Sequence, residues 1–260
     1  MEIRTVPTER KKQTTRRRGV SNLAREKSMT DSHEREWNAS YQRRDNFLFH
    51  PHEEVIRFVS RNIRKRVGFG EFVDVDAGPR NRKLLDLGCG IGRHVIFAHQ
   101  MGLDVYGVDL SARAVAEAVG WASREGVPDA GKRIVCSDLR KLPWPDATFD
   151  YVISHGVLDS MYFAVARAAI VETARVMANG GLFYCDLISG DDSSHSREFA
   201  GEEIVSTRHE QGTVQSYFNF AKIQSLAGEL FDIVQATLIK REDVLAGGMR
   251  SRYHVVLRKV

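Results

Sequence analysis

The chain has 260 residues, of which 42% are hydrophobic and 28% are charged, with a formal net charge of +4. This length suits one α/β domain with additions, and the apolar content is ordinary for a soluble globular protein. No apolar run approaches the roughly 18 residues that a membrane-spanning helix needs. The N-terminus also lacks the apolar core of a secretory signal, so we expect a cytoplasmic protein with no membrane partner.

The positive charge is concentrated at the N-terminus. Residues 1–30 hold nine Lys or Arg and three Asp or Glu, which leaves 29 basic and 31 acidic residues for the remainder. This segment has few apolar residues and no periodicity, so we predict a disordered basic tail. Such a tail could bind nucleic acid through its charge, but it has no aromatic residue to stack on bases. We favour a non-specific solvated tail, and Met29 as the natural start of the protein.

Residues 31–82 are expected to form an N-terminal helical cap and a loop. Apolar residues at helical spacing predict helices over 33–47 and 51–67, followed by a loop over 68–82. Trp37 and Tyr41 lie four residues apart on one face of the first helix. They are therefore candidates for a lid over a ligand.

From residue 83 onward, predicted strands alternate with predicted helices. The strands lie near residues 83–87, 104–108, 133–136, 149–154 and 180–188, and the helices near 92–101, 111–125 and 162–178. This alternation predicts a mostly parallel sheet with right-handed crossovers. Gly102 and the pair Gly180-Gly181 suit helix exits.

The pattern changes after residue 188. A polar loop is followed by a predicted hairpin near 202–218, which we interpret as an insertion on the substrate side. Asn219 is a plausible N-cap for a helix that continues to about residue 230. The segments 231–240 and 253–258 alternate apolar and polar residues and are expected to pair antiparallel.

A glycine-rich loop follows the first strand of the alternating region. Asp86 ends the apolar run, and glycines then stand at alternate positions, Gly88, Gly90 and Gly92. Glycine allows a positive φ and close approach of a ligand to the backbone. The next strand ends in Asp109, about where an acid suits ribose hydroxyls. The sequence therefore predicts a nucleotide-like ligand.

The acid before the glycines narrows the choice of ligand. A dinucleotide-binding loop normally lacks an acid there, and Asp86 would repel a pyrophosphate. S-adenosylmethionine (SAM) carries an ammonium and a sulfonium and no phosphate. The stretch Leu85–Gly92 resembles the first motif of the class I SAM-dependent methyltransferases. The run Leu142–Ser154 is similar to the "LPFPD-x-x-FD-x-V" run of their ubiquinone/menaquinone-type branch, and the turn Gly180–Leu182 resembles the one before their fifth strand.

The resemblance covers roughly residues 83–188 and implies a fold and a cofactor site. The implied fold is α/β, a doubly wound, seven-stranded, mostly parallel sheet with a reversed last strand and an N-terminal helical cap, the methyltransferase domain spanning 83–260. Asp86 would then favour the ammonium, Asp109 the ribose hydroxyls and Asp138 the adenine amino group. The complete implied set for SAM is Asp86, Gly88, Cys89, Gly90, Gly92, Asp109, Leu110, Asp138, Leu139 and Ser154.

The acceptor site is less defined by the sequence. His155 follows the fourth strand of the alternating region, where the family's loop faces the transferred methyl group. It could be a general base or could simply pack against the cofactor. The remaining candidates for the substrate side or the lid are Trp37, Tyr41, Asp159 and Tyr217, with His195 and His209 as further rim residues.

We predict no metal site and no structural disulfide. The spacing of Cys89, Cys136 and Cys185 matches no metal motif, and a reducing cytoplasm disfavours disulfides. Cys89 could be a reactive thiol, but we favour a small residue that fills a tight loop. His195 beside Asp191 and Asp192 is interpreted as part of a polar loop.

The predicted function is SAM-dependent methyl transfer to a small-molecule acceptor, by O-, N- or C-methylation. The near-neutral remainder of the chain favours a small molecule over nucleic acid. Two alternatives remain, an RNA or protein methyltransferase and a non-catalytic SAM-binding module. A general base is needed only for an acceptor that arrives protonated. The acceptor and the oligomeric state stay open.

Overall fold

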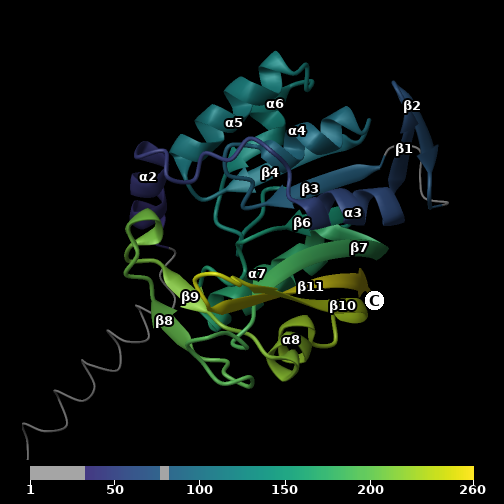
Figure 1. The fold of residues 1–260 in the computed structure, drawn as a ribbon. Coiled ribbons are helices and arrows are strands. Elements are labelled where there is room, and N and C mark those ends of the chain that lie inside the picture. Colours follow the sequence, from purple (N-terminus) through teal and green to yellow (C-terminus); the bar gives the residue numbers. More distant parts are fainter. Residues whose placement is uncertain (1–32, 77–81) are drawn as a thin grey trace, which may run out of the picture. The chain divides into compact units, whose positions relative to one another are not determined.

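A seven-stranded sheet forms the centre of the fold in the computed structural model (Figure 1), with the strand order β10-β11-β7-β6-β3-β4-β5. The strands are β3 (Lys83–Leu87), β4 (Asp104–Asp109), β5 (Ile134–Cys136), β6 (Phe149–Ser154), β7 (Met177–Ile188), β10 (Phe231–Glu242) and β11 (Met249–Lys259). Strands β3 to β7 are mutually parallel, whereas β11 runs antiparallel to both β7 and β10. The predicted doubly wound sheet with a reversed last strand is therefore confirmed.

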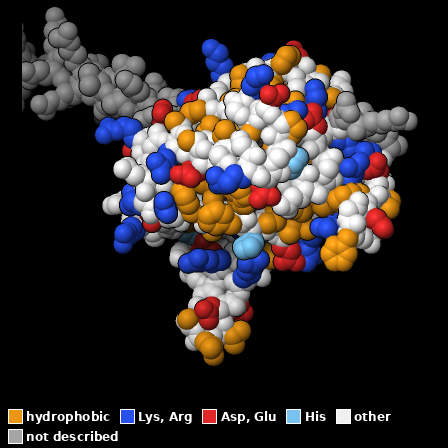
Figure 2. Space-filling model, turned by 90° about the horizontal axis from the view of Figure 1, so that it is seen from above, with side chains coloured by type: hydrophobic (Ala, Val, Ile, Leu, Met, Phe, Trp, Pro, Cys, Tyr) orange, Lys and Arg blue, Asp and Glu red, His pale blue; other side chains and the backbone are white. Residues whose placement is uncertain are grey.

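The structure describes residues 33–76 and 82–260, apart from the side chain of His209. The predicted disordered tail over 1–30 and the proposed start at Met29 lie outside these residues. No helix in the described part of the chain is long and apolar enough to cross a membrane. Figure 2 shows charged side chains of both signs spread over one face of the molecule, with smaller hydrophobic groups between them.

Helices cover both faces of the sheet. Five of the helices lie between Arg93 and Ala227: α4 (Arg93–Gln100), α5 (Ala112–Arg124), α6 (Ala130–Arg133), α7 (Phe163–Val176) and α8 (Phe220–Ala227). The alternation of strand side chains sends Leu84 to a core shared with α4 and α5. Leu85 and Leu87 point to the opposite core, which is shared with α7 and α8. Figure 1 shows α4, α5 and α6 together on one side of the sheet.

The N-terminal region differs from its prediction. Helix α2 spans only Glu34–Gln42, and α3 spans Glu53–Asn62 with His52 as its N-cap. The expected continuation of the second helix to residue 67 is wrong, because β1 (Arg64–Gly68) pairs antiparallel with β2 (Glu71–Asp74). The predicted loop over 68–82 is also wrong in part, because it contains the strand β2.

The register of this hairpin explains the change. Val67 continues the four-residue apolar spacing of α3, but it is 54% exposed, whereas Ile63 is fully buried. The helix therefore ends where its buried face ends. Arg64 then donates to the Asp74 carboxylate across the hairpin at 2.6 Å, and Gly70 takes the positive φ of the turn.

Two further predictions need small corrections. Gly102 follows α4 with a positive φ and is a helix exit as predicted. Gly180 and Gly181 are not, because α7 ends at Val176 and both glycines lie inside β7. Strand β7 begins early because Met177 pairs with Phe149 of β6. Residues 202–218 contain β8 (Glu202–Ile204), the 3-10 turn η1 (Arg208–Glu210) and β9 (Val214–Ser216), with β8 and β9 paired antiparallel.

Candidate active site

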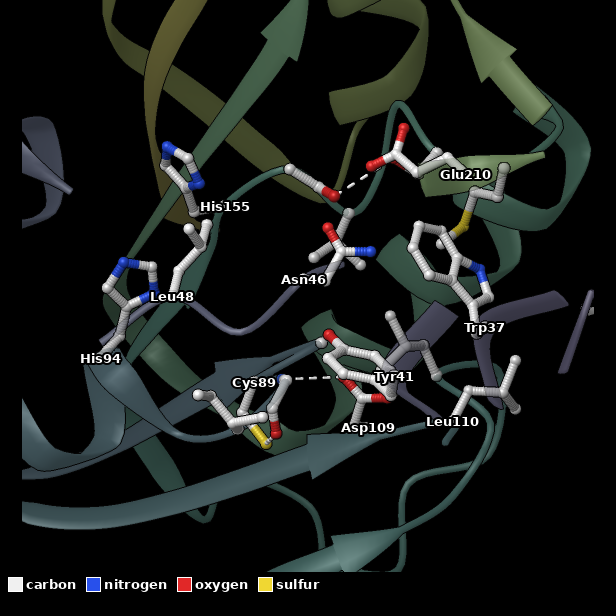
Figure 3. Close-up of a pocket in the computed structure, with 18 of the residues that line it drawn as sticks. Trp37, Tyr41, Asn46, Leu48, Cys89, His94, Asp109, Leu110, His155 and Glu210 are labelled. Atoms are coloured by element: carbon white, nitrogen blue, oxygen red, sulfur yellow. Dashed lines mark hydrogen bonds between the residues drawn. The ribbon is translucent and has the colours of Figure 1, made fainter. Parts of the chain in front are cut away.

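A cavity of about 280 Å³ lies at the carboxyl ends of β3, β4 and β6. This is the edge where open parallel sheets bind ligands. Figure 3 shows His94 and His155 at one end of the cavity, called here the histidine end, and Trp37 and Leu110 at the other. The lining includes Trp37, Tyr41, Asn46, Leu48, Gly88, Cys89, Gly90, Ile91, Arg93, His94, Asp109, Leu110, Asp138, Leu139, His155, Gly156, Val157, Ser160, Met161, Val165 and Glu210.

The glycine loop lies in contact with other cavity residues. A Cβ atom on Gly88 would stand 2.4 Å from Val157, and one on Gly90 would stand 2.7 Å from the Tyr41 hydroxyl. Both glycines also have a positive φ. No larger residue fits here without displacing its neighbours, so the loop presents its bare backbone to the cavity.

Asp109 connects this loop to the end of β4. Its carboxylate accepts from the backbone N–H groups of Gly90 and Ser111, each at 2.8 Å. Burial raises the pKa of Asp109 to about 6, and the backbone hydrogen bonds oppose that rise. The loop and the predicted ribose-binding acid are therefore one hydrogen-bonded unit.

Asp86 is buried without a complete set of partners. Its side chain is 1% exposed, its Oδ2 atom has no hydrogen-bond partner, and the nearest cationic candidate, His94 Nδ1, is 3.9 Å away. Burial raises the pKa of Asp86 well above its ordinary value. A buried carboxylate in this state is unfavourable unless a cationic group comes near it. Asp86 itself does not line the cavity, but it precedes the lining residue Gly88 by two positions.

The other predicted cofactor residues fall into two groups. Cys89, Leu110, Asp138 and Leu139 line the cavity. The Asp138 carboxylate accepts from the Arg140 guanidinium at 2.6 and 2.9 Å. Gly92 and Ser154 lie outside the lining. The Cβ position of Gly92 faces Ala118 at 3.2 Å, and the Ser154 hydroxyl is buried without a partner.

Helix α2 covers the cavity from above the glycine loop. Trp37 and Tyr41 both line the cavity, and Figure 3 shows the Tyr41 ring next to Asp109. Asn38 accepts a hydrogen bond from the Ser111 hydroxyl at 2.7 Å, which ties α2 to the end of β4. The placement of α2 therefore fits the predicted lid.

His155 lies in a network at the histidine end. Its Nδ1 atom is 3.3 Å from an Arg93 nitrogen, and its Nε2 atom is 3.4 Å from Asp186. Because a guanidinium only donates, Nδ1 must be the accepting atom and Nε2 carries the proton. Burial lowers the pKa of His155 to about 3, although Asp186 opposes that change. His155 is therefore neutral at physiological pH.

Three more histidines complete a cluster around it. The rings of His52 and His155 are 4.0 Å apart, those of His94 and His155 are 5.6 Å apart, and His254 stacks on His52 at 5.9 Å. We call these four residues the histidine cluster. Burial lowers the pKa of each. In the described part of the chain no group of three or more His, Cys, Asp or Glu is arranged to hold a metal ion.

A buried ion network supports the cluster from below. Arg252 of β11 donates to Asp186 of β7 at 2.8 Å and to Asp159 at 2.6 Å. Asp186 also accepts from the Gly156 backbone at 2.6 Å. Burial acts to raise the pKa of Asp186, but the neighbouring Arg252 guanidinium favours the charged carboxylate and lowers the pKa below its ordinary value. The network fixes the loop that carries His155.

The remaining acceptor candidates lie away from the cavity lining. Asp159 is 1% exposed, and its carboxylate accepts hydrogen bonds from the Arg252 guanidinium and the Ile188 backbone N–H. Tyr217 packs against His195 and Phe199 in the insertion, with ring distances of 4.5 and 5.3 Å. His195 is held by Asp192 and Glu203. The three cysteines are free thiols, and burial raises the pKa of Cys89, which agrees with a filling residue rather than a reactive one.

Sequence reasoning missed most of the histidine end. Arg93 and His94 follow the glycine motif directly, so their position beside it was an available signal. His52, Asp186 and Arg252 carried no local signal. They come together only because β7 and β11 are neighbours in the sheet and α3 packs beside them.

Comparison with known proteins finds a family match in the central part of the chain. Residues 85–185 match the family model described as a methyltransferase domain. An ajmaline N-methyltransferase of Rauvolfia serpentina is 28% identical over 160 residues, which are 61% of this chain and 54% of that protein. A sterol 4-C-methyltransferase of Caenorhabditis elegans is 30% identical over 141 residues, 54% of this chain and 39% of that protein. The chain thus spans about half or less of the length of these relatives.

Solved structures show the same fold. A SAM-dependent methyltransferase of Methanosarcina mazei has a TM-score of 0.58 at 18% identity and covers 70% of this chain and 94% of its own. The 1,6-didemethyltoxoflavin-N1-methyltransferase of Burkholderia thailandensis, solved with S-adenosylhomocysteine, has a TM-score of 0.52 at 18% identity, covering 70% and 72%. Residues 85–185 of this chain therefore match a methyltransferase domain, and the chain shares the fold of these solved methyltransferases.

Proposed function

We propose that the protein transfers a methyl group from SAM to a small-molecule acceptor. The observation that carries the proposal is the buried Asp86 carboxylate with an unpartnered oxygen next to a bare glycine loop. A cationic amino-acid end satisfies such a carboxylate, and a phosphate does not. Asp109, Leu110 and Asp138 at the cavity suit the nucleoside part.

The protein's main contribution is alignment and the exclusion of water. When bound, the cofactor supplies a methyl group on a positively charged sulfur. The glycine loop, Asp86 and Asp109 would hold that donor, and Trp37 and Tyr41 of α2, which line the cavity, would cover it. Holding two reactants in line in a closed cavity is itself a large part of such catalysis.

We propose His155 as the general base for an acceptor that arrives protonated. Its Nδ1 lone pair is the only one available on the neutral ring, and it accepts from Arg93 in the structure. Movement of that guanidinium would free Nδ1 to take a proton. Asp186 at 3.4 Å from Nε2 would then stabilise the imidazolium.

The size of the cavity, about 280 Å³, and the relatives support a small acceptor. The ajmaline N-methyltransferase and the sterol 4-C-methyltransferase that match this chain are named for small molecules. The run Leu142–Ser154 supports placing the chain in the ubiquinone/menaquinone-type branch. We also propose that the protein acts without a nucleic-acid partner and in the cytoplasm.

Calorimetry with SAM tests the donor site. We expect wild type to bind SAM and Asp86→Asn to bind it about 10-fold or more weakly, because a charge-assisted contact is lost. The matched control is Asp150→Asn, since Asp150 lies at the opposite end of β6 and accepts from the Lys83 backbone. Absence of SAM binding to the wild-type protein would contradict the proposal.

Labelled SAM tests the acceptor class. The wild-type protein is incubated with a metabolite extract, bulk RNA or bulk protein, each with and without sinefungin. We expect sinefungin-sensitive label in the metabolite fraction. Label in RNA or protein alone would favour the macromolecular alternative, and SAM binding without any transfer would favour a non-catalytic module.

A further inference from the structure

The hairpin formed by β10 and β11 extends beyond the carboxyl edge of the sheet. Strand β7 pairs with β11 only as far as Ile188 opposite Arg252, whereas β10 and β11 stay paired up to Glu242 opposite Met249. Figure 2 shows a narrow protrusion with hydrophobic and acidic side chains at its end and Lys, Arg and His side chains at its base. The hairpin therefore projects from the same edge of the sheet at which the cavity lies.

Two large apolar side chains are exposed at the tip of this hairpin. Val244 is 88% exposed and Leu245 is 98% exposed. Hydrogen bonds hold the turn that carries them, because the Asp243 carboxylate accepts from the backbone N–H groups of Leu245 and Ala246 at 3.0 and 2.8 Å. The turn thus keeps an apolar tip in one conformation in contact with solvent, which is unfavourable until a partner covers it.

Two arginines lie directly behind the tip. Arg241 of β10 stands opposite Arg250 of β11 in the register of the hairpin, and both are exposed. Within residues 33–76 and 82–260, neither forms an ion pair with a carboxylate. The neighbouring acid Glu242 belongs to the opposite face of the hairpin, because strand side chains alternate. Like charges opposite each other in an antiparallel pair are destabilising, and an anionic partner would relieve this repulsion.

The arginine pair also lies near the histidine end of the cavity. Burial is the main cause that lowers the pKa of His52, and the Arg241 charge contributes to the same change. Arg252 and His254 follow Arg250 at alternate positions of β11, so all three lie on one face of that strand. His254 stacks on His52 within the histidine cluster. The hairpin and the histidine end therefore share one side of the molecule.

We propose that this hairpin docks on the surface of an anionic lipid bilayer. Val244 and Leu245 would enter the boundary between headgroups and acyl chains, while Arg241 and Arg250 would lie at the level of the lipid phosphates. A free phosphate would neutralise the arginines but leave the apolar tip in water. The expectation of a protein with no membrane partner rested on the absence of a spanning segment, and surface docking needs none.

The size of the tip favours a lipid surface over a protein partner. Stable protein interfaces bury about 1,200–2,000 Å² in total, and two side chains at the end of a narrow hairpin supply only a small part of that area. A bilayer needs no matching surface, because each apolar side chain that enters it contributes separately. Docking would bring the histidine end close to the bilayer, from which an apolar acceptor would enter. That last step rests on the proposed methyl transfer, whereas the docking itself does not.

Vesicle flotation tests the docking. The full chain is mixed with vesicles of phosphatidylcholine alone or of phosphatidylcholine with phosphatidylserine. Replacing Val244→Ser and Leu245→Ser together should weaken binding to the mixed vesicles about 10- to 100-fold, because two apolar side chains no longer leave water. Arg241→Gln and Arg250→Gln should each weaken it about 5-fold, and only on the anionic vesicles. The matched control is Phe69→Ser in the turn between β1 and β2, an exposed apolar side chain whose loss should leave binding unchanged.

A local probe separates the tip from the basic N-terminal segment. Residues 1–30 hold nine Lys or Arg and would attract anionic vesicles by themselves. In Leu245→Trp, contact with acyl chains should shift the added emission to shorter wavelength and allow quenching by brominated phosphatidylcholine. The added emission of the control Phe69→Trp should stay unchanged. Undiminished vesicle binding by the double serine variant, together with no shift at position 245, would overturn the proposal.

Two further measurements keep the alternatives apart. Sedimentation without lipid gives the oligomeric state, and loss of an oligomer in the double serine variant would assign the tip to a second copy of the chain and overturn lipid docking. Calorimetry should give the same SAM affinity for this variant and wild type, and thermal melting should be unchanged because both side chains are exposed. Failure of wild type to bind SAM would defeat the proposed function, while vesicle binding that depends on the tip would still support the docking.

Discussion

The two ends of the cavity are built in different ways. The end near Leu110 is formed by a strand, a glycine loop and the next strand, which are close in sequence and joined by the Asp109 carboxylate. The histidine end is assembled from α3, α4, the loop after β6, and strands β7 and β11. His52 and His254 meet there although 202 positions separate them in the chain.

The two ends of the cavity are stabilised by different interactions. The glycine loop is held by backbone hydrogen bonds and by close packing that excludes side chains. The histidine end is held by a buried ion network in which one arginine serves two carboxylates. We expect changes at the glycine loop to act mainly on cofactor affinity, and changes at the histidine end to act on stability and turnover.

The largest effect should come from Arg252→Met. It leaves Asp159 and Asp186, both 1% exposed, without their shared cation. Removing one partner from a buried ion network costs about 3–5 kcal/mol. Urea unfolding measures the loss, and Arg250→Met, two residues away at an exposed position on β11, is the control. A loss no larger than that of the control would show that the network does not hold this end together.

The next effect is on turnover. His155→Gln should lower kcat about 100-fold for an acceptor that must lose a proton. The affinity for SAM should change little, which separates the two ends functionally. Steady-state kinetics at saturating SAM measures this, with His99→Gln on α4 as the control. An unchanged kcat would show that His155 only packs against its neighbours. A parallel loss of SAM affinity would show that the two ends of the cavity do not act separately.

A smaller effect is expected at the glycine loop. Asp109→Ala removes the acceptor for the Gly90 and Ser111 N–H groups, and should weaken SAM binding by about 10- to 100-fold. Calorimetry measures it, with Asp232→Ala on the exposed part of β10 as the control. If SAM affinity survives this change, the loop keeps its shape without the carboxylate.

The contrast between the ends also explains what the sequence could predict. The sheet, the glycine loop and the position of Asp109 follow from local patterns, because strand periodicity and loop chemistry are encoded by neighbours in the chain. No local sequence pattern predicts the histidine end. Asp186 and Arg252 become partners only through the register of β7 and β11, in which His254 lies opposite Asp186.

Local patterns also misled where burial did not follow them. The apolar spacing of α3 extends to Val67, and periodicity alone predicts a helix that far. The structure ends the helix at Asn62, because Val67 meets solvent and Arg64 finds a partner in Asp74 across a hairpin. Pairing across the hairpin decided this segment, and helical periodicity takes no account of such pairing.

The smallest expected effect is on the free energy of unfolding at acidic pH. Burial lowers the pKa of His94 well below 6.5, and its Nε2 accepts from the His52 backbone while Nδ1 faces Asp86. A histidine whose pKa is lowered in the folded state binds fewer protons than in the unfolded chain. Its contribution to stability is therefore complete above pH 6.5 and is lost as the pH falls below that value.

The expected slope can be isolated with one variant. Between pH 6.5 and 5.5, one such histidine should lower the free energy of unfolding by about 1 kcal/mol. Buried carboxylates with raised pKa values, such as Asp109, act in the opposite sense over this range, so the wild-type profile alone is ambiguous. The difference between wild type and His94→Gln cancels them, and urea unfolding at both pH values should show the wild type losing about 1 kcal/mol more. Equal losses would mean that His94 exchanges protons freely with solvent, and the histidine end would then be as open as the rest of the cavity.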